Sequence, residues 1–346
     1  MKSFARVYTP SCGRGVIRTS NVDFCVDEIL GFPPDGEGNH ILLHIEKKET
    51  NTDWLVQQLV RFVGVKAVDI GYAGKKDRHA HTKQWLSIHM SGVTEPDWEQ
   101  FNTEQYRILA VHRHRRKLRP GCLQGNHFEL VIRDLDVDWS LLDARLQKIK
   151  YSGVPNYFGE QRFGYNNLES AKKWLAGNKS KIKKTQQSIY ISVLRSYMFN
   201  CILDYRVREK NWNRVLGGDV MMLSGSHSCF VAEDHDALLQ QRLSEQDIAP
   251  TGPLCGLGES LVCGEAKALE QAVLIPYQGW IDALVVKKVK QRRRSLMLFL
   301  SDMVWQFEPD AACMKLSFTL PAGSYATVVL RELIEYKNAQ RSVNAI

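Results

Sequence analysis

One segment of the chain carries residue types that can do covalent chemistry. It reads GYAGKKDRHAHTKQ over residues 71–84. Its single carboxylate, Asp77, stands among the cations Lys75, Lys76 and Arg78, which favour the ionised form that a nucleophile requires. The same surroundings also suit an aspartate that only neutralises cations on a surface turn. The residues alone therefore leave a catalytic and a structural role open.

The spacing in this segment bears on two other kinds of chemistry. The phosphate-binding pattern G-x-x-x-x-G-K-[ST] is not met around Gly74. Alternate residues of a strand share a face, so Asp77, His79 and His81 could together hold a metal ion. A metal-dependent RNA hydrolase is thus an alternative, although no second acidic cluster stands nearby to hold a metal pair.

Two further segments combine polar groups with aromatic rings. Asn126 offers an amide that can read a base edge, two residues before the ring of Phe128. Residues 153–164 combine three aromatic residues with Arg162 and three glycines. Packing in the core is the ordinary alternative for each ring.

The charge of the chain favours a polyanionic partner. Its net charge is +8 and its pI is about 9.0. The cations gather in three runs, at residues 107–119, 172–184 and 287–294. Such runs often form only solvated faces, but three in one chain indicate a ligand as long as an RNA.

The remaining composition is that of an ordinary globular protein. Of the 346 residues, 44% are apolar and 24% are charged, and the eight cysteines form no CxxC pair. No secretory signal begins the chain, and no run of about 18 apolar residues could span a membrane. We expect a cytoplasmic enzyme without a membrane segment or zinc ribbon.

Hydrophobic periodicity predicts a mixture of helices and strands. Apolar residues recur at helical spacing from Leu55 to Val63, after the capping candidates Asn51 and Thr52 and before the stop at Gly64. Alternation predicts strands over 84–90 and 127–133. An amphipathic helix is expected over 189–207. A final strand, 315–320, precedes a helix that begins near Ala326. The pattern is that of an α+β protein.

A change of sequence texture predicts the domain boundaries. Between Gly153 and about residue 300 the chain becomes rich in glycine, lysine and loops. The strand and helix that follow are too short for a core of their own, so we expect them to complete the first unit. The predicted domains are residues 1–152 plus 304–346, and an insertion of residues 153–303.

Five blocks of the sequence resemble the TruD family of tRNA pseudouridine synthases. They are Asp23-Phe24 with residues 31–38 (GFPPDGEG), residues 74–84 (GKKDRHAHTKQ), 126–128 (NHF), 153–164 (GVPNYFGEQRFG) and 320–327 (LPAGSYAT). The resemblance implies a catalytic domain with a mixed, largely antiparallel sheet flanked by helices. It also implies an α/β insertion domain and a V-shaped, basic cleft between the domains.

The resemblance also implies roles for single residues. Asp77 is implied as the nucleophile. The implied substrate-binding positions are Phe24, Asn126, Phe128, Tyr325 and Arg18. Two of them depart from the common pattern, because the family often has Lys where Arg18 stands and Phe where Tyr325 stands. Arg18 can still pair with Asp77, and Tyr325 keeps a ring for stacking.

The implied reaction converts uridine to pseudouridine in tRNA, most often at uridine 13 of the D arm. It breaks the C1′–N1 bond and joins C1′ to C5 without redox change or added atoms, so we expect no cofactor and no metal. The family implies a monomer without an obligate protein partner. The remaining alternative is a non-catalytic protein that binds structured RNA, in which Asp77 is structural.

Overall fold

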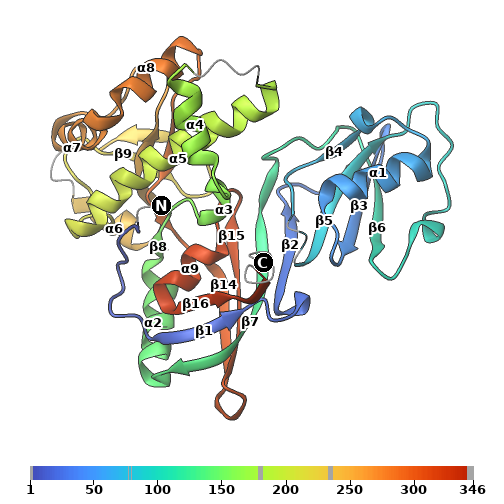
Figure 1. Cartoon of the computed structure of the whole chain (residues 1–346), viewed down its shortest axis with the longest axis horizontal. Coiled ribbons are helices and arrows are strands. Elements are labelled where there is room, and N and C mark those ends of the chain that lie inside the picture. Colours follow the sequence, from blue (N-terminus) through green and yellow to red (C-terminus); the bar gives the residue numbers. More distant parts are fainter. Residues whose placement is uncertain (1–2, 77, 79, 178–181, 233–236, 341–346) are drawn as a thin grey trace. The chain divides into compact units, whose positions relative to one another are not determined.

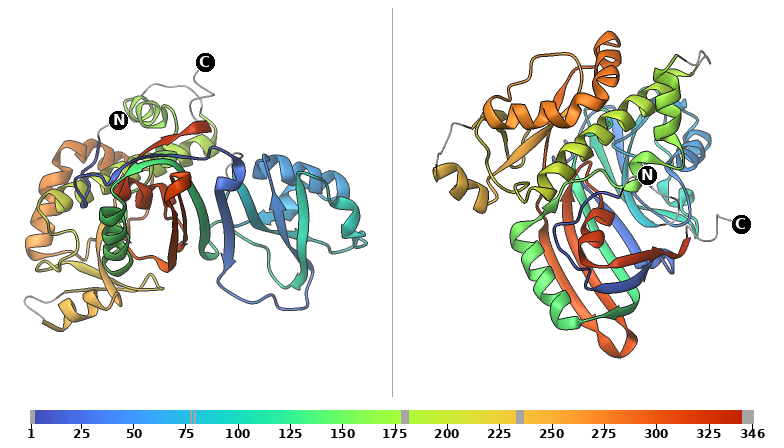
Figure 2. Two further views of the ribbon diagram at one scale, coloured as in Figure 1. Left: turned by 90° about the horizontal axis from the view of Figure 1, so that it is seen from below. Right: turned by 60° about the vertical axis from the view of Figure 1, so that its left-hand side comes forward.

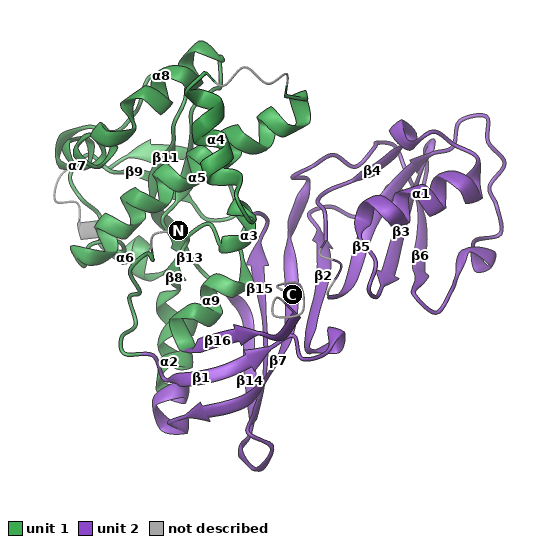
Figure 3. Ribbon diagram, in the orientation of Figure 1, with its two compact units in different colours: residues 1–10, 144–299, 324–333 green, residues 11–143, 300–323, 334–346 purple. Residues whose placement is uncertain are grey.

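The computed structural model describes residues 3–76, 78, 80–177, 182–232 and 237–340. The chain divides into two compact units (Figure 3). Unit 1 contains residues 1–10, 144–299 and 324–333, and unit 2 contains residues 11–143, 300–323 and 334–346. Within the described ranges, no helix combines the length and apolar character needed to cross a membrane.

Unit 2 is built on a ten-stranded sheet (Figure 1). Its main order is β14-β15-β7-β2-β5-β3-β6, while β1 pairs with β7 and β16, and β4 pairs with β5. The strands are β1 (Gly13–Ile17), β2 (Phe24–Leu30), β3 (His40–Lys47), β4 (Ile70–Tyr72), β5 (His81–His89), β6 (Tyr106–His114), β7 (Leu123–Val137), β14 (Ser301–Glu308), β15 (Cys313–Pro321) and β16 (Glu335–Asn338).

Most pairings in this sheet are antiparallel. The described exceptions are β2 with β5 and β1 with β16, which are parallel. Strand β7 lies at the centre, because one of its edges pairs with β15 and the other pairs first with β2 and then with β1. The predicted mixed, largely antiparallel sheet flanked by helices is confirmed.

Helix α1 (Thr52–Val63) covers part of one face of the sheet. The Asn51 side chain accepts a hydrogen bond from the Trp54 amide at its start, and Gly64 ends it in the left-handed conformation, with φ of 78°. Its buried Leu55 and Leu59 pack with residues of β3 and β5, including Ile45 and Leu86. The predicted helix is confirmed at both ends.

Strand register defines the two faces of the sheet, since directly paired residues point to the same side. Glu28 pairs with Asn126, and Ile45, which packs against α1, pairs with Gln84. We call this side the α1 face. Cys25 pairs with His81 and with Glu129, and these residues define the opposite face.

Unit 1 contains a four-stranded sheet, a two-stranded sheet and several helices (Figures 1 and 2). Helix α5 packs against both α4 and β11. The strands are β8 (Val154–Pro155), β9 (Val220–Leu223), β10 (Cys229–Val231), β11 (Ile248–Leu254), β12 (Arg292–Ser295) and β13 (Met297–Leu298). The helices are α3 (Glu160–Phe163), α4 (Asn167–Leu175), α5 (Lys184–Arg208), α6 (Ala237–Ser244), α7 (Gly264–Leu274), α8 (Gln278–Val286) and α9 (Ala326–Leu333).

Helix α2 (Trp139–Ser152) begins in unit 2 and ends in unit 1. The compact units therefore follow packing, whereas the predicted division separated a catalytic domain from an insertion. That division, with residues 153–303 as the insertion, stays a prediction, as do the V shape and the basic cleft. Short 3-10 helices fill several connections: η1 (Asn21–Asp23), η2 (Ala67–Asp69), η3 (Trp98–Phe101), η4 (Ile275–Tyr277) and η5 (Pro309–Ala311).

Candidate active site

The predicted nucleophile, Asp77, and its neighbour His79 lie outside the described residues. The residues on either side of Asp77 are anchored in unit 2. The Lys76 amide donates a 3.0 Å hydrogen bond to Thr52 Oγ1, and Arg78 Nε donates a 3.1 Å bond to the Glu49 carbonyl. The connection between β4 and β5 is therefore held on both sides of the candidate.

A buried polar chain links this connection to α1 and β5. Thr52 Oγ1 donates to Gln84 Oε1 over 3.0 Å, and Gln84 Nε2 donates to the Gly74 carbonyl over 2.6 Å. Both side chains are almost fully buried, at 1% and 0% exposed. Because buried polar groups are costly to leave unpaired, these bonds fix the path of residues 74–76 over the α1 face.

Lys76 joins two strands through its ammonium group. Its Nζ donates to Asn126 Oδ1 over 2.5 Å and lies 2.9 Å from Glu28 Oε1. The Glu28 side chain is fully buried, and its other oxygen accepts a 2.8 Å bond from the Trp85 amide. Burial raises the pKa of Glu28 above its ordinary value, and the positive charge of Lys76 acts in the opposite direction.

This contact fixes the orientation of the Asn126 amide. An ammonium group has only donors, so the rotated amide would place its own NH2 donors against those of Lys76. The carbonyl oxygen therefore faces Lys76, and Nδ2 is directed away from it. Asn126 thus carries an oriented donor on the α1 face.

Aromatic side chains lie on the same face. The Phe24 and Phe128 rings meet edge to face with centroids 6.3 Å apart, and Phe128 also contacts Phe318 at 5.6 Å. The Arg18 guanidinium lies 4.0 Å from the centroid of the Phe24 ring. Arg18 adopts the left-handed region with φ of 58°, which is uncommon for a residue with a side chain and costs about 1 kcal/mol or more.

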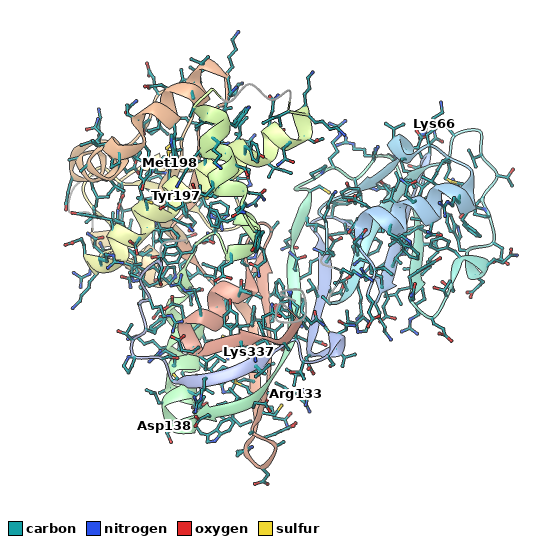
Figure 4. All side chains as sticks on the ribbon, viewed as in Figure 1. Lys66, Arg133, Asp138, Tyr197, Met198 and Lys337 are labelled. Atoms are coloured by element: carbon teal, nitrogen blue, oxygen red, sulfur yellow. The ribbon has the colours of Figure 1, made fainter. Side chains whose placement is uncertain are left out.

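A buried carboxylate fixes the start of β2. Asp23 accepts bonds of 2.8 to 3.2 Å from the guanidinium of Arg133 on β7, which is labelled in Figure 4, and one from the Ser20 amide. Burial opposes ionisation of Asp23, but the bonds from Arg133 and Ser20 outweigh it and hold its pKa below the ordinary value. The Asp23-Phe24 pair thereby sets the position of the Phe24 ring.

Tyr325 belongs to unit 1, where it directly precedes α9. Its ring centroid lies 6.3 Å from that of Phe158 and 5.9 Å from Arg162 Cζ. Gly159 approaches so closely that a Cβ there would stand 3.1 Å from Tyr325 Cγ. The segment 153–164 therefore shapes the surroundings of Tyr325, while its Tyr157 and Phe158 are buried.

The opposite face of the sheet holds a separate group of titratable side chains. His81 Nε2 lies 2.8 Å from Glu46 Oε1, and its Nδ1 lies 3.8 Å from Cys25 Sγ. Burial and nearby Glu129 raise the pKa of the Cys25 thiol, which makes it a poor nucleophile. A cavity of about 160 Å³ is lined by Cys25, Val26, Asp27, Glu46, His81, Lys83, His127 and Glu129.

The described residues contain no group of three or more metal-binding side chains arranged around a common point. Two members of the alternative metal site, Asp77 and His79, fall outside those residues. The third, His81, is directed to Glu46.

The structure thus brings together Arg18, Phe24, Asn126 and Phe128 on the α1 face, and places Tyr325 in the other unit. Sequence reasoning missed Glu28 as a partner of Asn126. The signal was present, because Phe24 and Val26 predict an apolar side of β2 on which Glu28 is the next member. A carboxylate at such a position requires a partner.

The fold and the described side chains define a class: an α+β protein with rings and an oriented amide that suit a nucleobase. The family model for tRNA pseudouridine synthase D (TruD) matches residues 5–172 and 165–333. The chain belongs to this family, whose enzymes isomerise uridine in tRNA. The expectation of an isomerase that processes tRNA is confirmed.

Relatives match over nearly the whole chain. A Methylococcus capsulatus protein named tRNA pseudouridine synthase D is 43% identical over 325 residues, which cover 93% of this chain and 92% of the relative. The Aeromonas hydrophila protein of the same name is 42% identical over 341 residues, or 98% and 96% of the two chains. A crystal structure from Methanosarcina mazei that carries the TruD name shares the fold, with a TM-score of 0.71, 23% identity and 95% coverage of both chains.

Proposed function

We propose that this chain converts uridine 13 of the tRNA D arm to pseudouridine, with Asp77 as the nucleophile and without a cofactor. We further propose that it acts as a cytoplasmic monomer. The observation that carries the proposal is the oriented Asn126 amide, because it is held by Lys76, the residue directly before Asp77. The amide that would contact the nucleobase is thus held by the residue next to the proposed nucleophile in the chain.

In this proposal the target nucleotide leaves the RNA stack, at a cost of a few kcal/mol, and is held beside Phe128 in unit 2. The Arg18 guanidinium covers one face of the neighbouring Phe24 ring. Arg18 supplies positive charge at the same place. The rings and the charge together favour an extruded, anionic nucleotide over an apolar ligand.

The Asn126 Nδ2 group donates a hydrogen bond to a carbonyl oxygen of uracil. Cytosine carries an amino donor in place of the O4 carbonyl, so a donor aimed at O4 accepts uridine and rejects cytidine. Negative charge develops on uracil as its bond to the sugar breaks. A fixed donor stabilises that charge without reorganisation during the reaction.

The Asp77 carboxylate adds to the base, attacks C1′ or assists the departure of uracil, and all three routes use the same residue. The C1′–N1 bond breaks, the uracil turns, C1′ joins C5, and the C5 proton is transferred to N1 overall. Product and substrate have the same atoms and oxidation state. This balance is why the proposal includes neither redox partner nor cofactor.

The test compares wild type with Asp77→Asn on unmodified tRNA transcripts in EDTA, with pseudouridine mapped chemically. We expect wild type to modify position 13, Asp77→Asn to modify nothing, and both to bind the tRNA equally. A transcript with cytidine at position 13 is the matched control. Modification by Asp77→Asn would contradict the nucleophile, and RNA cleavage that appears only in a parallel reaction with Mg²⁺ in place of EDTA would favour the metal-dependent hydrolase. Binding without modification by either protein would favour the non-catalytic role.

A further inference from the structure

Two basic runs that lie far apart in the sequence meet in unit 1. Lys287, just after α8, places its Nζ 4.3 Å from the centroid of the Trp174 ring in α4. Trp174 in turn packs against Tyr190 of α5, with centroids 5.8 Å apart. The lysines that stand near these residues in the sequence, which we call the lysine corner, are Lys172, Lys173, Lys183, Lys184, Lys287 and Lys288.

The positive charge of the lysine corner is largely uncompensated. Lys172 pairs with Glu169 at 2.7 Å. The other five lysines are exposed and form no ion pair with the described residues. Exposed ammonium groups without carboxylate partners are available to phosphates.

The run at residues 107–119 differs from the lysine corner, because several of its cations are paired with other groups of unit 2. Arg113 pairs with Glu95, and Arg115 pairs with Glu37. Lys117 donates to the Val68 carbonyl. Similar clusters of cations in the sequence thus have different availability for a ligand.

A polar stripe on α5 links the lysine corner to Tyr325 within unit 1. Lys184, Ser188 and Ser192 follow one another at intervals of four residues and therefore share one side of the helix. Ser192 Oγ accepts a 3.1 Å bond from Arg162, whose Cζ lies 5.9 Å from the Tyr325 ring. The eight residue steps from Lys184 to Ser192 span about 12 Å, at a rise of about 1.5 Å each.

We propose that the lysine corner binds the phosphodiester backbone of the substrate RNA a few nucleotides from the reacting uridine. A nucleic-acid strand in a helix carries a phosphate about every 3.4 Å along its axis, so the stripe spans about three or four phosphates. Compact ammonium groups bind phosphates as point charges. The Ser188 hydroxyl already donates to the Lys184 carbonyl, and the Ser192 hydroxyl, which accepts from Arg162, is a suitable phosphate donor. Trp174 supports Lys287 here, since the ammonium group occupies one face of its ring.

The identity of the ligand as tRNA rests on the proposed function. The positive charge of the lysine corner and its link to Arg162 and Tyr325 do not rest on the proposed function. The test therefore measures binding separately from chemistry, so that the two proposals can fail independently.

The test uses the full chain with Lys173→Glu, Lys184→Glu and Lys288→Glu combined. The matched control combines Lys210→Glu, Arg214→Glu and Lys267→Glu, which make the same charge change at exposed positions of unit 1. The dissociation constant for an unmodified tRNA transcript is measured across a salt series. Circular dichroism and thermal unfolding confirm that both variants fold.

We expect the corner variant to bind at least about tenfold more weakly at low salt and to lower the slope of log affinity against log salt by about 2 to 3. We expect the control to lose less than about threefold. In pseudouridine assays the corner variant should raise KM far more than it lowers kcat. Equal losses in the two variants, or no loss in the corner variant, would overturn the proposal. Absent pseudouridine with the expected binding difference would overturn the proposed function alone.

Discussion

Each unit holds a buried ion pair among its described residues, and the two pairs differ in what they bind. In unit 1, Arg206 and Asp219 are 2% and 1% exposed and meet through bonds of 3.0 to 3.2 Å. Arg206 also donates to the carbonyls of Asn211 and Arg214, and Asp219 accepts from the Leu216 amide. Apart from the pair itself, all these bonds go to backbone.

The Lys76–Glu28 pair of unit 2 holds one backbone group, the Trp85 amide, and in addition a side chain. The Lys76 side chain is 12% exposed and donates a hydrogen bond to another side chain, the Asn126 amide. An ion pair that holds backbone shapes a loop, whereas one that holds a side chain orients a functional group. Burial alone therefore does not distinguish a charge with a structural role from one that orients a functional group.

The largest effect that would test this comparison is on stability. Arg206→Met leaves Asp219 buried without its charge partner, and we expect the free energy of unfolding to fall by about 3–5 kcal/mol. Urea unfolding measures it. Arg14→Met, which removes the exposed pair with Asp136, is the control and should cost about 1 kcal/mol or less. If Arg206→Met also lowered the free energy of unfolding by about 1 kcal/mol or less, the structural role of the Arg206–Asp219 pair would be contradicted.

The second effect is on activity. Lys76→Met frees the Asn126 amide to rotate, and we expect kcat/KM to fall about 10- to 100-fold, or about 1.4–2.8 kcal/mol, mainly through kcat. Steady-state pseudouridine formation measures it. Lys75→Met is a matched control, because it removes a charge of the same kind one position earlier and Lys75, among the described residues, pairs with the exposed Asp53. Equal effects of the two substitutions would show that Lys76 has no positioning role.

The smallest effect is a pH dependence of stability. The pKa of Glu28 is raised in the folded state, so the native protein binds that proton more tightly than the unfolded chain does. Its contribution to stability therefore falls as pH rises from the ordinary value of about 4.5 towards the folded pKa.

Glu28→Gln should remove this slope. Urea unfolding of wild type and Glu28→Gln from pH 5 to 8 measures the difference between them. Parallel curves would show that the carboxyl does not titrate differently on folding.

Local patterns predicted what depends on neighbours in the chain. The start and end of α1, the strands around residues 84–90 and 127–133, and the helix over 189–207 follow from periodicity and capping, and all are confirmed. The rings and amide of the site came from motif spacing and the family resemblance.

Long-range register and backbone strain could not be predicted. Lys76 and Asn126 are 50 positions apart, and their contact depends on how β2 pairs with β7. The meeting of Lys287 with Trp174 likewise follows from tertiary packing. The left-handed conformation of Arg18 has no local signal, because it is not a glycine.

The central sheet of unit 2 also constrains how the chain folds during synthesis. Strand β7 completes its edge only with residues 313–321, and β1 obtains its parallel neighbour only with residues 335–338. Until the ribosome has released that last strand, β1 and β7 present unpaired edges to other chains. Pairings so distant in sequence also slow folding, because the loops they close are long. A nascent chain of this protein is therefore expected to depend on protection of the β7 edge until residues 313–321 have emerged, and of the β1 edge until residues 335–338 have emerged.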